Sequence, residues 1–242
     1  MVASMSTAAE VCDELNGLGN ATDAKFLQRF FKTGEGQYGA GDVFIGVRVP
    51  AVRRVAAKYK DLSLEELPKL LASPVHEHRL AAVIIMTNQS KRADEQGKRE
   101  LYDLYLRSTD RINNWDIVDV SCRDVVGGYL APRSKQPLYV LARSQSIWER
   151  RIAIVSTWQF IREGELDETF KIAAMLGSDT HDLIHKAVGW MLREAGKKDE
   201  ARLRKFLDQY AATMPRTMLR YSIERLPSQD RQAYMRQKEL TV

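Results

Sequence analysis

The chain has 242 residues, with 37 Lys and Arg against 32 Asp and Glu, and 44% of its residues are hydrophobic. These fractions exclude a disordered or collagen-like chain, and the length suits one large domain or two small ones. The longest apolar run, Leu80 to Met86, is far shorter than the roughly 20 residues that cross a bilayer, and residues 1–10 carry no signal-peptide pattern. Cys12 and Cys122 are too few for a disulfide framework. We therefore expect a cytoplasmic protein that does not bind membranes.

The formal net charge of +5 is distributed unevenly along the chain. Residues 1–196 carry 26 basic and 26 acidic side chains, whereas residues 197–242 carry 11 and 6. A basic segment suits phosphate binding, but solvated helix faces often carry a similar excess. The charge alone therefore leaves both interpretations open.

Apolar residues recur at helical spacing almost throughout the chain, whereas strand-like alternation with Asn-Gly turns is missing. Thr7 with Glu10 and Ser63 with Glu66 form two possible capping boxes, which mark helix starts. From Ser63 onward, short polar breaks divide the chain into helices of roughly ten to twenty residues that come in pairs. The sequence therefore predicts an all-α protein.

Between the first helices and this paired region lies a Gly-rich loop, residues 33–46, with five glycines. Its segment Gly34-Glu-Gly36-Gln-Tyr-Gly39 fits the dinucleotide-binding fingerprint, but that motif requires a strand before it and a helix directly after it. A helical run precedes this loop instead, so we expect a flexible loop and no nucleotide cofactor. Lys32 and Arg48 at its two ends are then placed to lie against a phosphate backbone.

The second helices of the pairs resemble one another. Aligning Arg79, Arg151 and Lys186 gives separations of 72 and 35 residues, about two periods and one period of a HEAT-like helical repeat. A further copy is expected near residue 115, where another helix opens. Antiparallel helix pairs of this kind stack into an α-solenoid, and its concave face is the usual binding surface.

A carboxylate interrupts the apolar pattern of the helix near residue 115. Trp115 and Asp119 are four residues apart and therefore share one helix face. Asp116 is nearer the helix start, where the helix dipole favours a negative charge. Asp119 has no such explanation, so it is either paired with an arginine of a neighbouring helix or a functional group. The apolar stripe of this helix consists of Val118, Cys122, Val125 and Tyr129.

Two further helices carry comparable anomalies. Arg151 falls in the middle of an apolar face, where an unpartnered guanidinium is costly. It either pairs with a carboxylate such as Asp119 or emerges at the edge of the face to hold a phosphate. Trp190 stands between Lys186 and Arg193 on a basic stripe, which suits either packing against a neighbour or contact with nucleic acid or a sugar.

The histidines do not form a convincing metal site. His181-Asp-Leu-Ile-His185 resembles the metalloprotease helix motif, but Asp replaces Glu and no third ligand is evident. His76 and His78 point to different sides of a helix. We therefore expect no metal, and the four histidines of the chain offer no catalytic triad or Cys-His pair.

Three motifs occur in the same order and spacing as in a known enzyme family. They are Trp115-Asp-Ile-Val-Asp119, Ile147-Trp-Glu-Arg-Arg151 and Ile184-His-Lys-Ala-Val-Gly-Trp190-Met-Leu-Arg-Glu194. Together with the segment from Phe30 to Pro50, they closely resemble the AlkD family of bacterial DNA glycosylases. The resemblance covers roughly residues 20–226. It implies a single HEAT-like domain over residues 1–242, with a C-terminal tail at 227–242.

The resemblance also implies an activity. Members of this family wrap duplex DNA and excise alkylated purines, typically 3-methyladenine and 7-methylguanine, in base excision repair and without drawing the lesion into a pocket. By matching motif, Asp119 is the catalytic carboxylate, Trp115 and Trp190 flank the deoxyribose of the lesion, and Arg151 grips the backbone. Phe30 matches a family tyrosine near the lesion but lacks the hydroxyl. The DNA-binding set that we expect comprises Arg151, Lys186, Arg193, Phe30, Lys32 and Arg48.

The chemistry agrees with this assignment. Alkylation at N3 or N7 makes the purine a cationic leaving group, so the enzyme mainly has to stabilise positive charge on the sugar. We therefore expect a monofunctional hydrolase that acts as a monomer without a cofactor and tolerates bulky N3 adducts. The alternative is a non-catalytic HEAT-like protein that binds branched or distorted DNA, although such relatives depart at the catalytic positions that this chain keeps. A protein-binding solenoid would require a concave face that is not basic.

Overall fold

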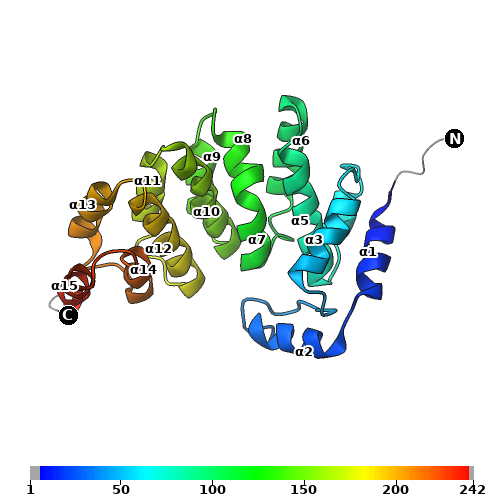
Figure 1. Cartoon of the computed structure of the whole chain (residues 1–242), viewed down its shortest axis with the longest axis horizontal. Helices are drawn as coiled ribbons and strands as arrows, with labels where there is room; N and C mark the ends of the chain where they lie inside the picture. The colour runs from blue at the N-terminus through cyan, green and yellow to red at the C-terminus, as the bar shows by residue number, and fades with distance from the viewer. Residues whose placement is uncertain (1–5, 240–242) are drawn as a thin grey trace. The chain divides into compact units, whose positions relative to one another are not determined.

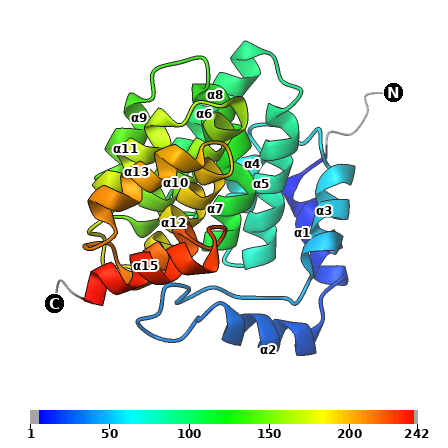
Figure 2. The same ribbon diagram turned by 60° about the vertical axis from the view of Figure 1, so that its left-hand side comes forward.

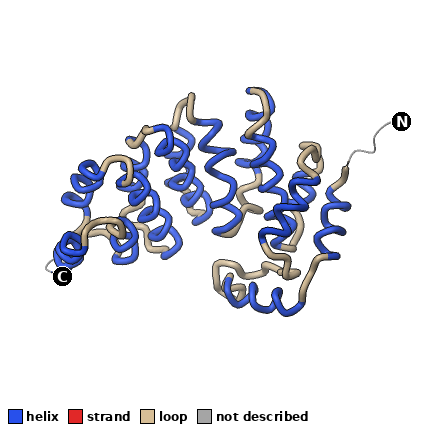
Figure 3. The backbone as a smooth tube through the Cα atoms, in the orientation of Figure 1, coloured by secondary structure: helices blue, strands red, loops and turns tan. Residues whose placement is uncertain are grey.

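The computed structural model describes residues 6–239, and this part of the chain is all helical (Figure 3). Residues 6–239 contain no strand, and their one isolated bridge joins Val43 to Val75 in parallel. The prediction of an all-α protein is confirmed. The helices group into two compact units, Met1–Val125 and Val126–Val242. The single domain over residues 1–242 stays a prediction.

The first unit is built around a helix, labelled α5 in Figure 1, whose side chains are buried almost all round. This helix, α5, contains the apolar run Leu80 to Met86, and it packs against α3, α4, α6 and α7. The first helix, α1, lies beside α3 (Figure 2). In contrast, α2 contains no buried residue. The helices of this unit are α1 (Ala8–Gly17), α2 (Ala21–Phe30), α3 (Val49–Lys58), α4 (Leu67–Leu71), α5 (His76–Ser90), α6 (Glu95–Arg107) and α7 (Trp115–Cys122).

The second unit has two long central helices. One of them, α10, packs against α9, α11 and α12, and α12 in turn packs closely on α14. The close approach requires Gly189, because a Cβ there would lie 2.5 Å from the Cβ of Tyr221. The helices of this unit are α8 (Gly128–Leu130), α9 (Gln136–Ala142), α10 (Ile147–Glu163), α11 (Asp167–Met175), α12 (Asp182–Gly196), α13 (Glu200–Tyr210), α14 (Arg216–Ser222) and α15 (Ser228–Glu239).

Local capping explains where several helices begin. Thr7 and Glu10 form the predicted capping box of α1. The second predicted box is wrong, because α4 begins only at Leu67 and Ser63 makes no side-chain cap. Glu66 instead accepts a hydrogen bond from the backbone N–H of Ala8, at 2.8 Å, and so joins α4 to the start of α1. The N-caps Asn20, Asp94, Ser146 and Asp199 each accept a hydrogen bond from the first turn of their helix.

One contact recurs at the start of three helices and defines the register of the repeat. Arg79, Arg150 and His185 each donate to the backbone carbonyl six residues earlier, in the turn before their helix. This common contact places the second and third copies one residue earlier than the alignment through Arg151 and Lys186 predicts. The helix expected near residue 115 is present, since α7 starts at Trp115, whereas its being a further copy of the repeat stays a prediction.

The predicted C-terminal tail is largely a helix, because α15 extends to Glu239. Tyr234 on this helix is buried, and its hydroxyl donates to Asp208 at 2.8 Å. Residues 240–242 lie outside the described part. No helix within residues 6–239 is long and apolar enough to cross a membrane.

Candidate functional site

Two predicted site residues of the first unit, Trp115 and Asp119, lie on α7. Asn114 caps this helix and accepts a hydrogen bond from the N–H of Trp115 at 2.8 Å. Trp115 and Asp119 are both partly exposed, one helical turn apart on the same face. Between them, Ile117 and Val118 are completely buried and hold the helix against α5. One face of α7 is therefore packed in the core, and the opposite face presents an indole and a carboxylate.

Aromatic rings pack against the indole of Trp115. Trp115 stacks on Phe31, with ring centroids 5.2 Å apart and an interplanar angle of 16°. Phe31 in turn stacks on Phe44, whose ring lies 4.4 Å from that of His76. Phe30 approaches Trp115 edge-on, with centroids 6.1 Å apart. This stack restricts the Trp115 ring to one orientation, so the two aromatic residues that the sequence pairs with the lesion, Phe30 and Trp115, do lie together.

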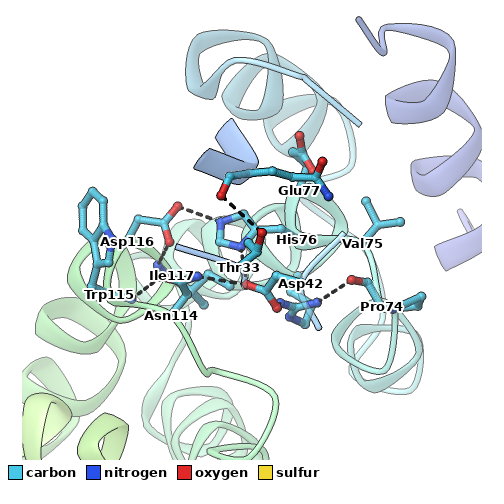
Figure 4. A network of polar contacts seen from close by, with 12 residues as sticks. Thr33, Asp42, Pro74, Val75, His76, Glu77, Asn114, Trp115, Asp116 and Ile117 are labelled. Carbon is cyan, nitrogen blue, oxygen red and sulfur yellow. Dashed lines mark hydrogen bonds and ion pairs between the residues drawn. The ribbon is translucent and has the colours of Figure 1, made fainter. Parts of the chain in front are cut away.

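A buried polar network around His76 adjoins this stack through the contacts of His76 with Phe31 and Phe44, and Figure 4 shows the network. The two ring nitrogens of His76 lie 3.1 Å from Asp42 Oδ2 and 2.9 Å from Asp116 Oδ2. Burial on its own would lower the pKa of His76, but the two carboxylates raise it to about 9. For the carboxyl group of Asp42, burial acts in the opposite direction and would raise the pKa. Hydrogen bonds and charges from His76, Arg79 and Asn114 nevertheless hold the pKa of Asp42 below its ordinary value. Four charged groups are therefore buried here as a neutral set.

The network contains residues that the sequence analysis missed. Its interpretation of Asp116 as a residue favoured by the helix dipole is incomplete, since Asp116 is buried and bonded to His76. Asp42 and His76 come from the Gly-rich loop and from α5, respectively. No spacing along the chain links these positions. The one available signal was that Asp42 is an acidic residue directly before the apolar residues Val43 and Phe44.

The Gly-rich loop is anchored at its C-terminal end. Glu77 accepts hydrogen bonds from three consecutive N–H groups, those of Ile45, Gly46 and Val47, at distances of 2.8 to 3.2 Å. Gly46 has φ +82°, and a Cβ there would lie 2.0 Å from the backbone carbonyl of Asn20. The expectation of a flexible loop is therefore wrong for this end. The loop follows α2 and not a strand, so the fingerprint lacks its structural context.

The predicted basic residues beside this loop differ in their surroundings. Lys32 is exposed and has an unusual positive φ of 52°. Arg48 is also exposed, but it makes a bidentate ion pair with Asp23 of α2, at 2.7 and 2.8 Å. The Arg48 hydrogen bond lowers the pKa of Asp23. An exposed pair of this kind contributes little stability and can exchange for a phosphate.

The predicted site residues of the second unit are Arg151, Trp190, Lys186 and Arg193. Arg151 is 5% exposed, as its place in an apolar face predicts, and its guanidinium donates to the carbonyl of Leu183 at the start of α12. Trp190 is partly exposed and lies edge-on against Trp158, with ring centroids 5.0 Å apart. Trp190 therefore packs on an aromatic neighbour and still presents part of its indole.

The basic stripe around Trp190 is matched by acidic residues. Lys186 pairs with Asp182 one turn earlier, at 2.7 Å. Arg193 pairs with Glu224 and lies 3.5 Å from Glu194. The Lys186 pair is about half exposed and so is weak, whereas Arg193 is mostly covered. Of the two predicted phosphate contacts, Lys186 is therefore the more accessible.

The histidines of α12 have structural roles. His181 caps this helix and accepts a hydrogen bond from the N–H of Leu183 at 3.2 Å. His185 bonds the Asp179 carbonyl, and the Asp179 carboxylate pairs with Arg150 at 2.6 Å. Among the described residues, no group of three or more His, Cys, Asp or Glu side chains is arranged to hold a metal ion.

One protein family matches most of the chain. The sequence model of the family described as DNA alkylation repair enzyme matches residues 11–226. The chain belongs to this family. It thereby has a general role in DNA alkylation repair, and the predicted relationship is confirmed. No curated protein matches the chain.

Two solved structures resemble this DNA alkylation repair protein. One is described as a predicted DNA alkylation repair enzyme from Enterococcus faecalis; its TM-score is 0.67 at 16% identity, and the match covers 87% of this chain and 97% of that chain. The other is smu.31 from Streptococcus mutans UA159, with a TM-score of 0.49 at 16% identity and a coverage of 96% and 98%. At this identity, the first similarity shows that the all-α fold of the repair protein is shared.

Proposed function

We propose that this protein is a DNA glycosylase that hydrolyses the N-glycosidic bond of cationic alkylated purines in duplex DNA. Its substrates would include 3-methyladenine, 7-methylguanine and bulky N3 adducts, and it would act without flipping the base into a pocket. The product is an abasic site, and the strand is not cut. The proposal refines the general role in alkylation repair that family membership assigns.

The observation that carries the proposal is the pairing of Trp115 and Asp119 on α7. As the glycosidic bond breaks, the sugar acquires the positive charge of an oxocarbenium ion. A carboxylate and the electron-rich face of an indole both attract such a charge, most strongly when they are held in place before the reaction. The stack of Trp115 on Phe31 supplies this fixed orientation. In the proposal, Asp119 also orients or deprotonates the attacking water.

The proposal also gives roles to residues of the second unit. Trp190 provides the second aromatic surface for the deoxyribose, supported by its contact with Trp158. Arg151 is assigned the phosphate backbone beside the lesion, and because it is 5% exposed its guanidinium would have to leave the Leu183 carbonyl to reach a phosphate. Lys186, Arg193, Lys32, Arg48 and the exposed ring of Phe30 add contacts to the duplex.

The proposed chemistry sets the substrate range. A cationic purine is already a good leaving group, so the enzyme needs neither strong acid catalysis nor a pocket that reads the base. Selectivity then comes from the lability of the bond, and adducts that project from the groove are tolerated. Neutral lesions are expected to be poor substrates.

The release of free 7-methylguanine from methylated duplex DNA tests this function. We expect the wild-type protein to release the base and Asp119→Asn to slow its release at least about 100-fold, with DNA binding little changed. The matched control is Asp103→Asn, which removes a partly exposed carboxylate on α6 whose partner, Arg99, lies 3.8 Å away. Full activity of Asp119→Asn would contradict the assigned role.

Two further outcomes separate the proposal from its alternatives. A covalent protein–DNA product trapped by borohydride would show a lyase that uses an amine, whereas we expect none. Absence of base release, together with tight binding to junction DNA, would favour a non-catalytic protein that recognises branched DNA.

A further inference from the structure

His76 lies between two carboxylates in the interior of the first unit. Its Nδ1 is 3.1 Å from Asp42 Oδ2 and its Nε2 is 2.9 Å from Asp116 Oδ2, and the residue is 1% exposed. A neutral imidazole has one N–H, so it can donate to only one of these oxygens. The imidazolium can donate to both. With both carboxyl groups ionised, only the charged form of His76 satisfies both contacts.

The groups that face His76 come from three separate segments of the chain. Asp42 belongs to the Gly-rich loop, Asp116 to α7, and Arg79 to α5, where its guanidinium is bonded to Asp42. The side chain of Arg111 lies behind Arg79 and donates to backbone carbonyls of the turn before α5. Two buried anions are thus balanced by the two buried cations, His76 and Arg79. Removal of one member leaves an uncompensated charge in the core.

The network bonds both sequence neighbours of Trp115. The residue before it, Asn114, donates to Asp42 Oδ2 at 2.9 Å, and the residue after it, Asp116, accepts from His76. The imidazole ring also underlies the aromatic stack, because its centroid lies 5.0 Å from that of Phe31, on which Trp115 stacks. His76 is therefore bonded to one sequence neighbour of Trp115 and linked to the other through Asp42 (Figure 4). It also contacts the ring beneath the indole, and it is itself buried.

We propose that charged His76 is a positioning residue that fixes the Trp115 indole and the first turn of α7, with Asp119 one turn further on, for base excision. The inference rests on the glycosylase function proposed above. The contact acts at a distance from the reacting atoms, and small displacements of a catalytic group are enough to cost a large part of the rate.

Single-turnover excision with enzyme in excess tests this role. We expect His76→Gln to lower the rate constant for 7-methylguanine release at least about 10-fold while duplex affinity stays within about 3-fold. The control is His78→Gln on the same helix, because His78 is also buried but bonds the neutral side chains of Ser73 and Asn16. A purely structural role would reduce the fraction of active enzyme in both variants and leave the rate constant of the folded fraction unchanged.

The emission of Trp115 gives a second readout that does not depend on activity. It is obtained as the difference between each protein and the same protein carrying Trp115→Phe. We expect His76→Gln, and independently Asp116→Asn, to shift this emission and to increase its quenching by acrylamide, whereas His78→Gln leaves it unchanged.

A measurement on the wild-type protein covers the case in which the variants do not fold. The imidazole nitrogens of His76, observed by NMR with ¹⁵N-labelled histidine, should report a doubly protonated ring at pH 8. A neutral ring at that pH would overturn the inference.

The outcomes distinguish the two proposals. If the wild-type protein releases no base, the glycosylase function fails, and the emission and NMR measurements still decide whether His76 positions Trp115. If the wild-type protein is active and His76→Gln excises at the wild-type rate, the positioning role is overturned and the glycosylase function stands.

Discussion

The ring of Phe31 lies parallel to the Trp115 indole, with centroids 5.2 Å apart and an angle of 16° between the planes. Phe31 is 6% exposed and belongs to the segment that ends α2, whereas Trp115 begins α7. Phe31, which no sequence motif indicated, therefore packs against Trp115, which the motifs did indicate. The contact joins the N-terminal segment of the protein to the candidate site.

Replacement of Phe31 by Leu should loosen this contact. We expect a loss of about 1–3 kcal/mol in the free energy of unfolding, because the smaller side chain leaves a void under the indole. Urea unfolding, followed by fluorescence, measures the loss. Phe26→Leu is the matched control, since Phe26 on α2 is 61% exposed and its replacement should change stability by less than about 0.5 kcal/mol. Equal effects of the two variants would contradict the supporting role of Phe31.

His76 should make the stability of the protein depend on alkaline pH. Its folded-state pKa is raised from 6.5 to about 9, so its contribution is fully present below pH 6.5 and is lost as the pH rises through 9. The shift corresponds to about 3 kcal/mol at most. The measurement is the difference in the free energy of unfolding between wild type and His76→Gln from pH 6 to pH 10. A difference that stays constant over this range would show that His76 does not titrate there.

Glu77 should control the order of the Gly-rich loop. Its buried carboxylate accepts from the N–H groups of Ile45, Gly46 and Val47, and Glu77→Gln places an amide N–H₂ among these donors. We expect a loss of about 1–3 kcal/mol in stability and faster proteolysis within residues 33–48. Glu65→Gln changes an exposed carboxylate of the same unit and should alter neither quantity. Unchanged cleavage of Glu77→Gln would contradict the anchoring role.

The close packing of α12 on α14 should not tolerate a side chain at Gly189. A Cβ there would lie 2.5 Å from the Tyr221 Cβ and 2.6 Å from the Met218 carbonyl, so we expect Gly189→Ala to cost about 1–3 kcal/mol. Thermal unfolding checks this prediction. Gly17→Ala meets no atom within 4 Å and should be neutral or slightly stabilising. A Gly189→Ala protein as stable as wild type would show that the two helices can separate at little cost.

Much of the fold could be predicted from the sequence because helical periodicity is a local signal. The apolar stripe of α12 illustrates this, since Ile184, Ala187, Val188, Met191 and Ala195 recur at helical spacing and are all fully buried. The same periodicity placed Arg151 in an apolar face, and the structure shows it buried. The register of the repeat was wrong by one residue, because it depends on which side chain reaches back to the preceding turn.

By itself, the sequence determined the helical class, the family and the residues whose chemistry stands out against the helical pattern, above all Trp115, Asp119 and Trp190. These follow from spacing within single helices. Only the tertiary structure decided what supports them, because Asp42, His76 and Asp116 lie far apart along the chain and no spacing links them. Burial gives them their meaning, because charged groups removed from water must pair with one another, and that requirement acts through space rather than along the sequence.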